Sequence, residues 1–503
     1  MFLASLLIGC QPDWATEVDK STAYTPEASI EPSAEIEPSV EPSTEEPLEP
    51  IANISVMGAY FIGDTVVFDG SNSHDPQGGA LDFSWSCSNG ESSSEESISF
   101  AAEEEGNVQC DLSVTSSSNL SASTSQTTRV LSKPEYADWT VMLFIAGDNN
   151  LEEAGIEDIN EMEIAGSSAQ VNLLVEFDRS PQYTAAEGDW SGARRFYITQ
   201  DTSDEIRSPV MQDLGEIDSG DPREIADFAK WGIENYPAEK FAFIIWNHGW
   251  SWSFTNQSAL LKGISSDDST GNDITVAGGE LASLLEEISF YADGKLEFLG
   301  FDACTMQSWE VAHIAHPYAK YLTASQDYVD FDGWDYEHSM QDLLDNPEMD
   351  GADLGEAIAY RFFQTGDATK SVLDLSKLPA FETALDNFAS LMMENGSGQL
   401  FRQAARNTYS YDGSEWGEDH DIGGLLSYIA NNTDSSELQD KASLAEQALD
   451  ELVIINYVQD YYSDATGLSI YSPPYRDWGV SQEYLDANWS QTSLWDDMLV
   501  DFQ

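Results

Sequence analysis

The sequence has little positive charge. Lys and Arg together number 20, against 91 Asp and Glu, which leaves a formal net charge of −71. A surface of this sign repels phosphate backbones and anionic lipid alike. Nucleic acid is therefore not expected as a partner, and the acidity predicts a well-hydrated exterior that attracts cationic groups.

Long apolar runs are also missing. No stretch approaches the roughly 18 apolar residues that a membrane helix requires. The nearest is residues 1–10, which end in Leu7-Ile8-Gly9-Cys10 and resemble a bacterial lipoprotein signal. We expect Cys10 to be lipid-modified, the protein to be extracellular or in the cell envelope, and the membrane to be reached only through this anchor. No Lys or Arg precedes the short run, so a frayed apolar terminus is the alternative.

Cysteine is scarce as well: the four are Cys10, Cys87, Cys110 and Cys304. Their positions indicate separate roles rather than one disulfide framework. Residues 11–50 repeat Glu-Pro-Ser and are rich in Thr, which predicts a disordered, extended linker because little apolar area can be buried.

Residues 51–131 show short alternating strands separated by Gly, Asn, Asp and Pro turns. This pattern is typical of a small β-sandwich. The run Phe68-Asp69-Gly70-Ser71-Asn72-Ser73-His74-Asp75-Pro76, followed by Trp85, resembles the polycystic-kidney-disease (PKD) type of immunoglobulin-like module. Two cysteines in an exported sandwich usually pair, so Cys87 and Cys110 are expected to join its two sheets.

Residues 138–503 alternate apolar strands with helices, which predicts a mostly parallel sheet flanked by helices. Helices are expected near residues 222–235 and 279–291, each followed by an apolar strand. The region from Gly351 is expected to belong to the same unit, to pack on the sheet and to extend it. It contains predicted helices at 378–394 and 435–457 and a strand-like run at 468–471.

Two of these strands end just before His248 and Cys304. Ligands bind at the carboxyl edge of parallel sheets, and a nucleophilic thiol needs a base held within reach. Taken alone, each residue is more typical of packing or capping; together they favour catalysis. The sequence has no G-x-S-x-G elbow, H-E-x-x-H helix or P-loop, the usual marks of serine, zinc and nucleotide mechanisms.

The region from Asp138 onward resembles the clostripain family of caspase-like cysteine peptidases. The resemblance rests on Ala146-Gly147-Asp148-Asn149-Asn150-Leu151, Trp246-Asn247-His248-Gly249, Phe301-Asp302-Ala303-Cys304-Thr305-Met306 and Asp332-Gly333-Trp334-Asp335-Tyr336. The caspase signature around the cysteine is absent.

The resemblance implies an endopeptidase acting on proteins or peptides after Arg or Lys. Cys304 would be the nucleophile and His248 its base, and the N–H groups of Gly249 and Cys304 would receive the oxyanion. Asp302 would face the basic side chain of the substrate, with Asp332 as a second candidate for that wall.

The resemblance further implies self-cleavage at Lys262-Gly263. No cofactor is expected to be required; calcium is possible, for instance in the loop 327–335, but the sequence specifies no metal ligands. The main alternative function is a catalytically inactive surface binding or adhesion protein on the same scaffold, and another hydrolase on an α/β sheet is a further one.

Overall fold

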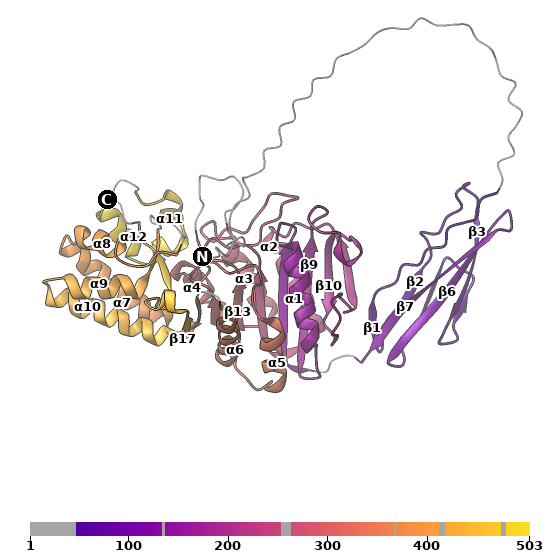
Figure 1. The fold of residues 1–503 in the computed structure, drawn as a ribbon, viewed down its shortest axis with the longest axis horizontal. Helices are drawn as coiled ribbons and strands as arrows, with labels where there is room; N and C mark the ends of the chain where they lie inside the picture. Colours follow the sequence, from indigo (N-terminus) through magenta and orange to yellow (C-terminus); the bar gives the residue numbers. More distant parts are fainter. Residues whose placement is uncertain (1–46, 133–135, 253–262, 367–368, 412–417, 474–478) are drawn as a thin grey trace, which may run out of the picture. The chain divides into compact units, whose positions relative to one another are not determined.

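The computed structural model describes residues 47–132, 136–252, 263–366, 369–411, 418–473 and 479–503 (Figure 1). They divide into two compact units, with the boundary between the described residues Ser132 and Tyr136. Among the helices of these ranges, none has the length and apolarity needed to cross a bilayer.

The first unit is a β-sandwich of two sheets. The larger sheet has the order β1 (Ala59–Phe61), β7 (Ser121–Leu131), β6 (Gly106–Ser116), β3 (Leu81–Cys87) and β4 (Ser92–Ser93), and the smaller pairs β2 (Thr65–Asp69) with β5 (Ser97–Ala101). Alternate residues face inward, so that Val66, Phe68, Trp85, Leu112 and Val114 form the core. Period-two alternation in the sequence therefore corresponds to one buried face for each sheet.

Cys87 and Cys110 form a disulfide in this unit, but not between the sheets. They lie directly opposite each other on β3 and β6, which are neighbours in the larger sheet, with their Cα atoms 4.0 Å apart. The expectation of an inter-sheet bridge was wrong because the strand register, which the cysteine positions alone do not specify, places both residues on one ladder.

The second unit is built on a nine-stranded sheet. Its strands are, in order across the sheet, β11 (Val210–Gly215), β10 (Gly192–Tyr197), β9 (Val171–Arg179), β8 (Ala137–Gly147), β12 (Ala238–Trp246), β13 (Leu296–Asp302), β14 (Ala319–Ala324), β15 (Thr369–Asp374) and β17 (Val453–Val458). The five from β9 to β14 run parallel, and the outer pairs are antiparallel. The predicted α/β class, a mostly parallel sheet flanked by helices, is confirmed.

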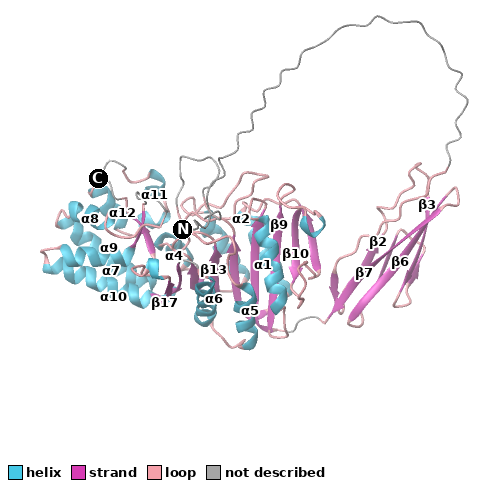
Figure 2. Ribbon diagram, in the orientation of Figure 1, coloured by secondary structure: helices cyan, strands magenta, loops and turns pink. Residues whose placement is uncertain are grey.

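Helices cover both faces of this sheet (Figure 2). One face packs against α1 (Glu152–Ala165), α5 (Tyr336–Asp345) and α6 (Gly351–Thr365), with Val141 and Ile145 of β8 pointing toward them. The other face packs against α2 (Pro222–Asn235), where Phe144 of β8 contacts Phe228. On this side α2 packs against α3 (Glu280–Tyr291), and α3 packs against α4 (Trp309–Ala315). Burial on both faces explains why these strands read as continuous apolar runs.

The C-terminal part adds a helical layer beside the sheet, in yellow and orange in Figure 1. Its helices are α7 (Leu378–Glu394), α8 (Gly398–Ala405), α9 (Ile422–Asn432), α10 (Ser436–Leu452), α11 (Gln482–Asp486) and α12 (Trp495–Asp501), and β16 (Asp419–Asp421) pairs with β18 (Ser469–Tyr471). The helix expected over residues 435–457 ends at Leu452. The next residues, rich in Val and Ile, form β17, because branched side chains favour a pleated strand. The region extends the large sheet, as expected, through β15 and β17, while the run at 468–471 contributes β18 of the small sheet.

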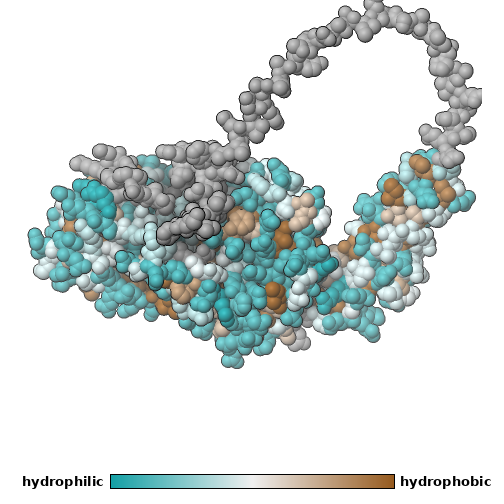
Figure 3. All heavy atoms as spheres, viewed as in Figure 1, coloured by the Kyte–Doolittle hydropathy of each residue, from teal (hydrophilic) through white to brown (hydrophobic). Residues whose placement is uncertain are grey.

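The visible face of the molecule is mostly hydrophilic, as the composition predicts (Figure 3). Single hydrophobic residues are scattered among the polar ones, which is ordinary for a protein surface.

Candidate active site

His248 and Cys304 leave neighbouring strands at the same level. β12 and β13 are parallel partners, and Trp246 lies opposite Asp302. The ladder continues one step further, because the backbone N–H of Asn247 donates to the carbonyl of Asp302 at 3.2 Å. His248 lies two residues after Trp246, and Cys304 lies two residues after Asp302. Neighbouring strands lie about 4.8 Å apart, so both residues leave the sheet side by side. Both residues are buried.

Each member of this pair has a defined contact. The Nε2 atom of His248 lies 2.8 Å from Oδ1 of Asn150, so the neutral ring donates from Nε2 and carries its lone pair on Nδ1. The Sγ atom of Cys304 accepts the backbone N–H of Val329 at 3.3 Å. A donor aimed at sulfur favours negative charge there, and the ring nitrogen with the lone pair is the one suited to take up a proton.

The backbone around the pair is unusually constrained. A Cβ atom on Gly249 would lie 2.4 Å from the carbonyl oxygen of Cys304, so only glycine allows the two loops to approach this closely. Thr305 has a φ of 57°, in the left-handed region that a β-branched residue rarely adopts. Its N–H is held by the carbonyl of Asp327. Strain of this kind, on the order of 1–3 kcal/mol, concentrates at functional sites.

A small cleft of about 30 Å³ lies beside Cys304. It lies on the face of the sheet that α1 and α5 cover, because Trp246 and Cys304 belong to the core cluster of that face. The lining residues are Leu151, Trp246, Asn247, Asp302, Ala303, Cys304, Val329, Asp330, Phe331 and Gly333. The cleft is thus lined mainly by apolar and aromatic side chains, with the acids Asp302 and Asp330 at its border.

Asp302 is the buried acid of this cleft. Only 3% of it is exposed, and its Oδ2 accepts the N–H of Trp334 and the hydroxyl of Tyr336, both at 3.0 Å. Asp158 of α1 lies behind it and accepts the indole N–H of Trp246 at 2.6 Å. Burial, followed by the charge of Asp302, raises the pKa of Asp158 well above its usual value. The carboxyl groups of Asp158 and Asp302 thus lie close together behind the cleft, both near Gly333.

The sequence pattern did not single out Asp158, although a signal was present. It stands four residues after Ala154 and four before Met162, on the buried stripe of α1. A carboxylate on the apolar stripe of a helix is unusual and marks a position with a specific partner.

The other predicted site residues do not all lie at the cleft. Asp332 is exposed and is not among the residues that line the cleft; the exposed acid of this loop that does line it is Asp330. Gly263 is buried, and a Cβ atom there would lie 1.9 Å from the carbonyl oxygen of Ile274. Lys262 and Cys10 lie outside the described residues.

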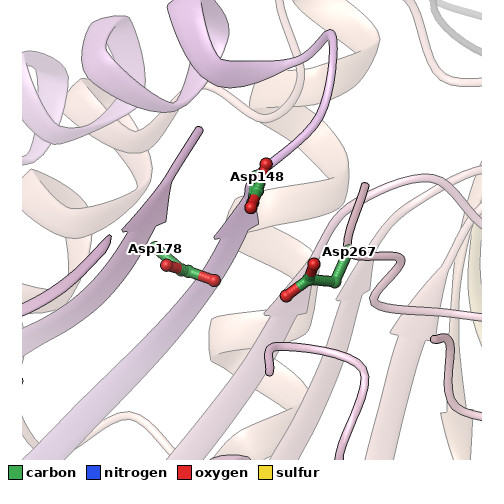
Figure 4. Close-up of side chains that lie close together, drawn as sticks. All are labelled: Asp148, Asp178 and Asp267. Atoms are coloured by element: carbon green, nitrogen blue, oxygen red, sulfur yellow. The ribbon is translucent and has the colours of Figure 1, made fainter. Parts of the chain in front are cut away.

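A separate group of acids could hold a metal ion. Asp148, Asp178 and Asp267 are all buried, and one oxygen from each lies within 4.8 Å of the others. Figure 4 shows them converging from the turn after β8, from β9 and from the loop that follows β12. In the described ranges this is where three carboxylates converge, rather than in the loop 327–335 considered from the sequence.

Comparison with known proteins agrees with this geometry. Residues 143–502 match the model of the clostripain family, and residues 48–131 match that of the PKD domain. Clostripain from Hathewaya histolytica is 27% identical over 394 residues, which span 66% of this chain and 74% of that protein.

Two solved structures share the fold. The secreted C11 cysteine protease from Bacteroides thetaiotaomicron, in complex with an irreversible peptide inhibitor, has a TM-score of 0.53 and 23% identity over 72% of this chain and 99% of its own. An inactive zymogen C11 protease from Parabacteroides distasonis has a TM-score of 0.54 and 21% identity, covering 71% and 98%. With most of its length matched by the family model, this chain belongs to the clostripain family of cysteine peptidases.

Proposed function

We propose that this protein is an endopeptidase that cleaves after Arg or Lys with a dyad of Cys304 and His248. The observation that carries the proposal is the register of β12 and β13, which delivers a thiol and an imidazole to one edge beside a cleft with a buried acid. A pair fixed on adjacent strands stays in reach without ordering a mobile loop.

The reaction follows from these positions. The Cys304 sulfur, as thiolate, forms a bond to the scissile carbonyl carbon, and the oxygen takes up negative charge. The backbone N–H groups of Gly249 and Cys304 are the proposed donors to that oxyanion. When the tetrahedral intermediate collapses, the C–N bond breaks and His248 delivers its proton to the leaving amine. Water then attacks the acyl-enzyme, with His248 as base, and the thiol is released.

Asp302 is the proposed determinant for a basic side chain. Its Oδ2 accepts from the Trp334 N–H and the Tyr336 hydroxyl, which fix the direction of the carboxylate beside the cleft. A guanidinium or ammonium entering the cleft would form a charge-assisted hydrogen bond in a partly desolvated place. Asp330, exposed at the same cleft, adds long-range attraction.

The test uses the full chain, reduced and supplied with Ca²⁺, against fluorogenic peptides that end in Arg, Lys, Asp or Ala. Cleavage after Arg and Lys that disappears in Cys304→Ala supports the dyad and the specificity together. A folded wild-type chain that cuts none of the four would overturn the proposal and favour the alternative, an inactive binding or adhesion protein.

We also propose that the enzyme cleaves itself between Lys262 and Gly263. The support is chemical: the bond follows a basic residue, and the chain after it is anchored, since Ile264 pairs with Gly249 and with Ile274. The expected products are two fragments, the second beginning Gly-Ile-Ser-Ser, and Lys262→Ala and Cys304→Ala should remain intact. An intact wild-type chain with full activity would refute self-cleavage.

For location we propose an exported protein that is tethered through lipid on Cys10. Labelled palmitate should be incorporated into the wild-type chain in a bacterial host and not into Cys10→Ala. Equal labelling of the two chains would remove the tether from the account.

A further inference from the structure

Trp252 lies four residues after His248 and is buried against the C-terminal part of the second unit. Its ring meets three aromatic rings edge to face, at centroid distances of 4.6 Å to Tyr471 of β18, 4.7 Å to Tyr484 of α11 and 6.4 Å to Trp489. We call these three side chains the aromatic seat. Tyr484 contacts both of the other rings, at 4.5 and 5.2 Å, so the seat is one packed cluster. Edge contacts between aromatic rings are directional, so the seat holds Trp252 in one orientation.

The N–H end of the Trp252 ring is held as well. Its Nε1 donates to Oδ1 of Asp419 at 3.3 Å. Asp419 belongs to β16 and lies directly opposite Tyr471 in the antiparallel pair of β16 and β18. One two-stranded ribbon therefore contacts both the indole N–H and the edge of the ring. A buried tryptophan that is packed and hydrogen-bonded in this way is a rigid anchor for its backbone.

The same ribbon also holds the chain that follows Cys304. The N–H of Ser469, on β18, donates to the carbonyl of Gln307 at 3.0 Å. The N–H of Tyr471 donates to Oε1 of Glu310, in the first turn of α4, at 3.1 Å. Gln307 and Glu310 are both buried. The ribbon of β16 and β18 is thus joined to the segments that follow both members of the dyad.

The chain that carries His248 is short and fixed at both ends. It begins where β12 ends, at Trp246, and it reaches the aromatic seat at Trp252. Ser251, just before the anchor, has a φ of 53°, in the left-handed region. A residue other than glycine is uncommon there and stays there only when the surrounding structure enforces it. The packing of Trp252 supplies such a constraint on the next residue.

We propose that Trp252 is a positioning residue for the dyad, and that the aromatic seat keeps the imidazole of His248 within reach of Cys304. The inference rests on the proposed roles of these two residues. Asn150 contacts the ring of His248, whereas Trp252 fixes the backbone that carries it. A short loop held at both ends has few other conformations, so little ordering is left to be done when substrate binds. The C-terminal layer thereby takes part in catalysis without touching the substrate.

The test compares Trp252→Leu and Trp252→Phe with a matched control, Trp139→Leu, in the full chain. Trp139 is also a buried tryptophan of this unit, but it lies near the start of β8, at the end of the sheet away from the dyad. All variants are assayed on Arg peptides below the lowest melting temperature among them.

We expect kcat of Trp252→Leu to fall about tenfold or more, with KM changed by less than about threefold. Trp252→Phe keeps a ring for the aromatic seat, so its kcat should stay within about threefold of wild type. Trp139→Leu should lower the melting temperature and leave kcat unchanged. If Trp252→Leu behaves like Trp139→Leu, losing stability but not kcat, the positioning role is overturned.

Alkylation of Cys304 gives a measurement that does not require peptide cleavage. Its rate with iodoacetamide is followed across pH by mass spectrometry of the peptide that contains Cys304. An imidazolium held beside the sulfur lowers the pKa of a thiol, so the wild type should react well below the value of about 8.5 that is usual for cysteine. The profile should move toward that of an ordinary thiol in Trp252→Leu and should not move in Trp139→Leu.

The two possible failures are distinguishable in this measurement. An ordinary thiol profile in the wild type would overturn the dyad, and this inference with it. A low-pH profile shared by the wild type and Trp252→Leu would keep the dyad and overturn only the role of Trp252. Should Trp252→Leu not fold, Trp489→Leu removes the most distant ring of the aromatic seat and leaves Trp252 in place. It should displace kcat and the thiol profile in the same direction, and an unchanged profile would again overturn the proposal.

Discussion

Replacing Asp302 with asparagine removes one charge from the inner end of the cleft and leaves its shape nearly unchanged. Asparagine retains a carbonyl oxygen that can accept from Trp334 N–H and Tyr336 hydroxyl, so the fold and the neighbouring thiol should be preserved. What is lost is the proposed partner of a positively charged substrate side chain. The cost therefore falls on specificity and not on the chemical step.

The magnitude can be worked from the burial of Asp302, which is 3% exposed. Removing one member of a buried, hydrogen-bonded charge pair costs about 2–5 kcal/mol, and each 1.4 kcal/mol is roughly tenfold. Because the cleft is open on one side, the lower half of this range applies. We expect kcat/KM for Arg and Lys peptides to fall about 100-fold, while the slow cleavage of an Ala peptide changes less than about threefold.

The assay compares wild type, Asp302→Asn and Asp332→Asn on the same fluorogenic peptides. Asp332 is exposed and outside the cleft lining, so its variant is the matched control for lost charge and should stay within about threefold. Alkylation of Cys304 at equal rates in the three proteins would establish that the dyad is intact. If Asp302→Asn retains Arg cleavage within threefold of wild type, the assignment of this pocket is refuted.

Three further predictions concern other parts of the chain. Asn150→Ala removes the contact to His248 Nε2, so kcat should fall about tenfold with KM nearly unchanged and the pH profile displaced; an unaltered profile would show that Asn150 does not position the ring. Burial lowers the pKa of His420 to about 4, so the folded state holds this histidine neutral. The free energy of unfolding should therefore be highest above pH 6.5 and should decrease by about 3 kcal/mol as the pH falls toward 4. The urea midpoint of His420→Gln should decrease less over this pH range, and an equal decrease in the two proteins would contradict the reasoning. Reducing the bond between Cys87 and Cys110 should destabilise the first unit by about 2–4 kcal/mol and leave peptide cleavage unaltered, as proteolysis of that unit beside activity would show.

Local patterns in the sequence were enough to place His248 and Cys304 at one edge of a parallel sheet. His248 and Cys304 each follow a continuous apolar run, and such runs become central parallel strands whose ends meet at one edge. The helix predicted at 222–235 has the same bounds in the structure, because Asp221 caps it and Pro222 begins it. Periodicity and capping depend on residues that are close together in the sequence, so both can be recognised from the sequence alone.

The features that were missed depend on register between distant segments. The pairing of Cys87 with Cys110 in one sheet requires knowing which residues of β3 and β6 are opposite. The end of α10 at Leu452 could not be predicted, because a helix and a buried strand can both be apolar. The β-branched residues from Val453 form a strand only because β15 offers a sheet edge for them to pair with. The convergence of three acids from separate segments leaves no spacing pattern at all.

The scarcity of basic residues in the composition limits how many buried acids can form ion pairs. With 20 basic residues against 91 acidic ones, internal cations are few, and the structure uses two of them on buried acids: Arg179 on Glu152 and Arg195 on Glu176. The acids at the carboxyl edge of the sheet are arranged differently.

Asp178 follows Phe177, whose side chain faces α1, so Asp178 and its cluster lie toward the α2 face, whereas Asp302 lies toward α1. The same edge therefore carries two acidic sites on opposite sides of the His248 loop. Of these acids Asp302 is the one that lines the cleft beside Cys304, so removing its charge should change the choice of substrate more than the chemical step.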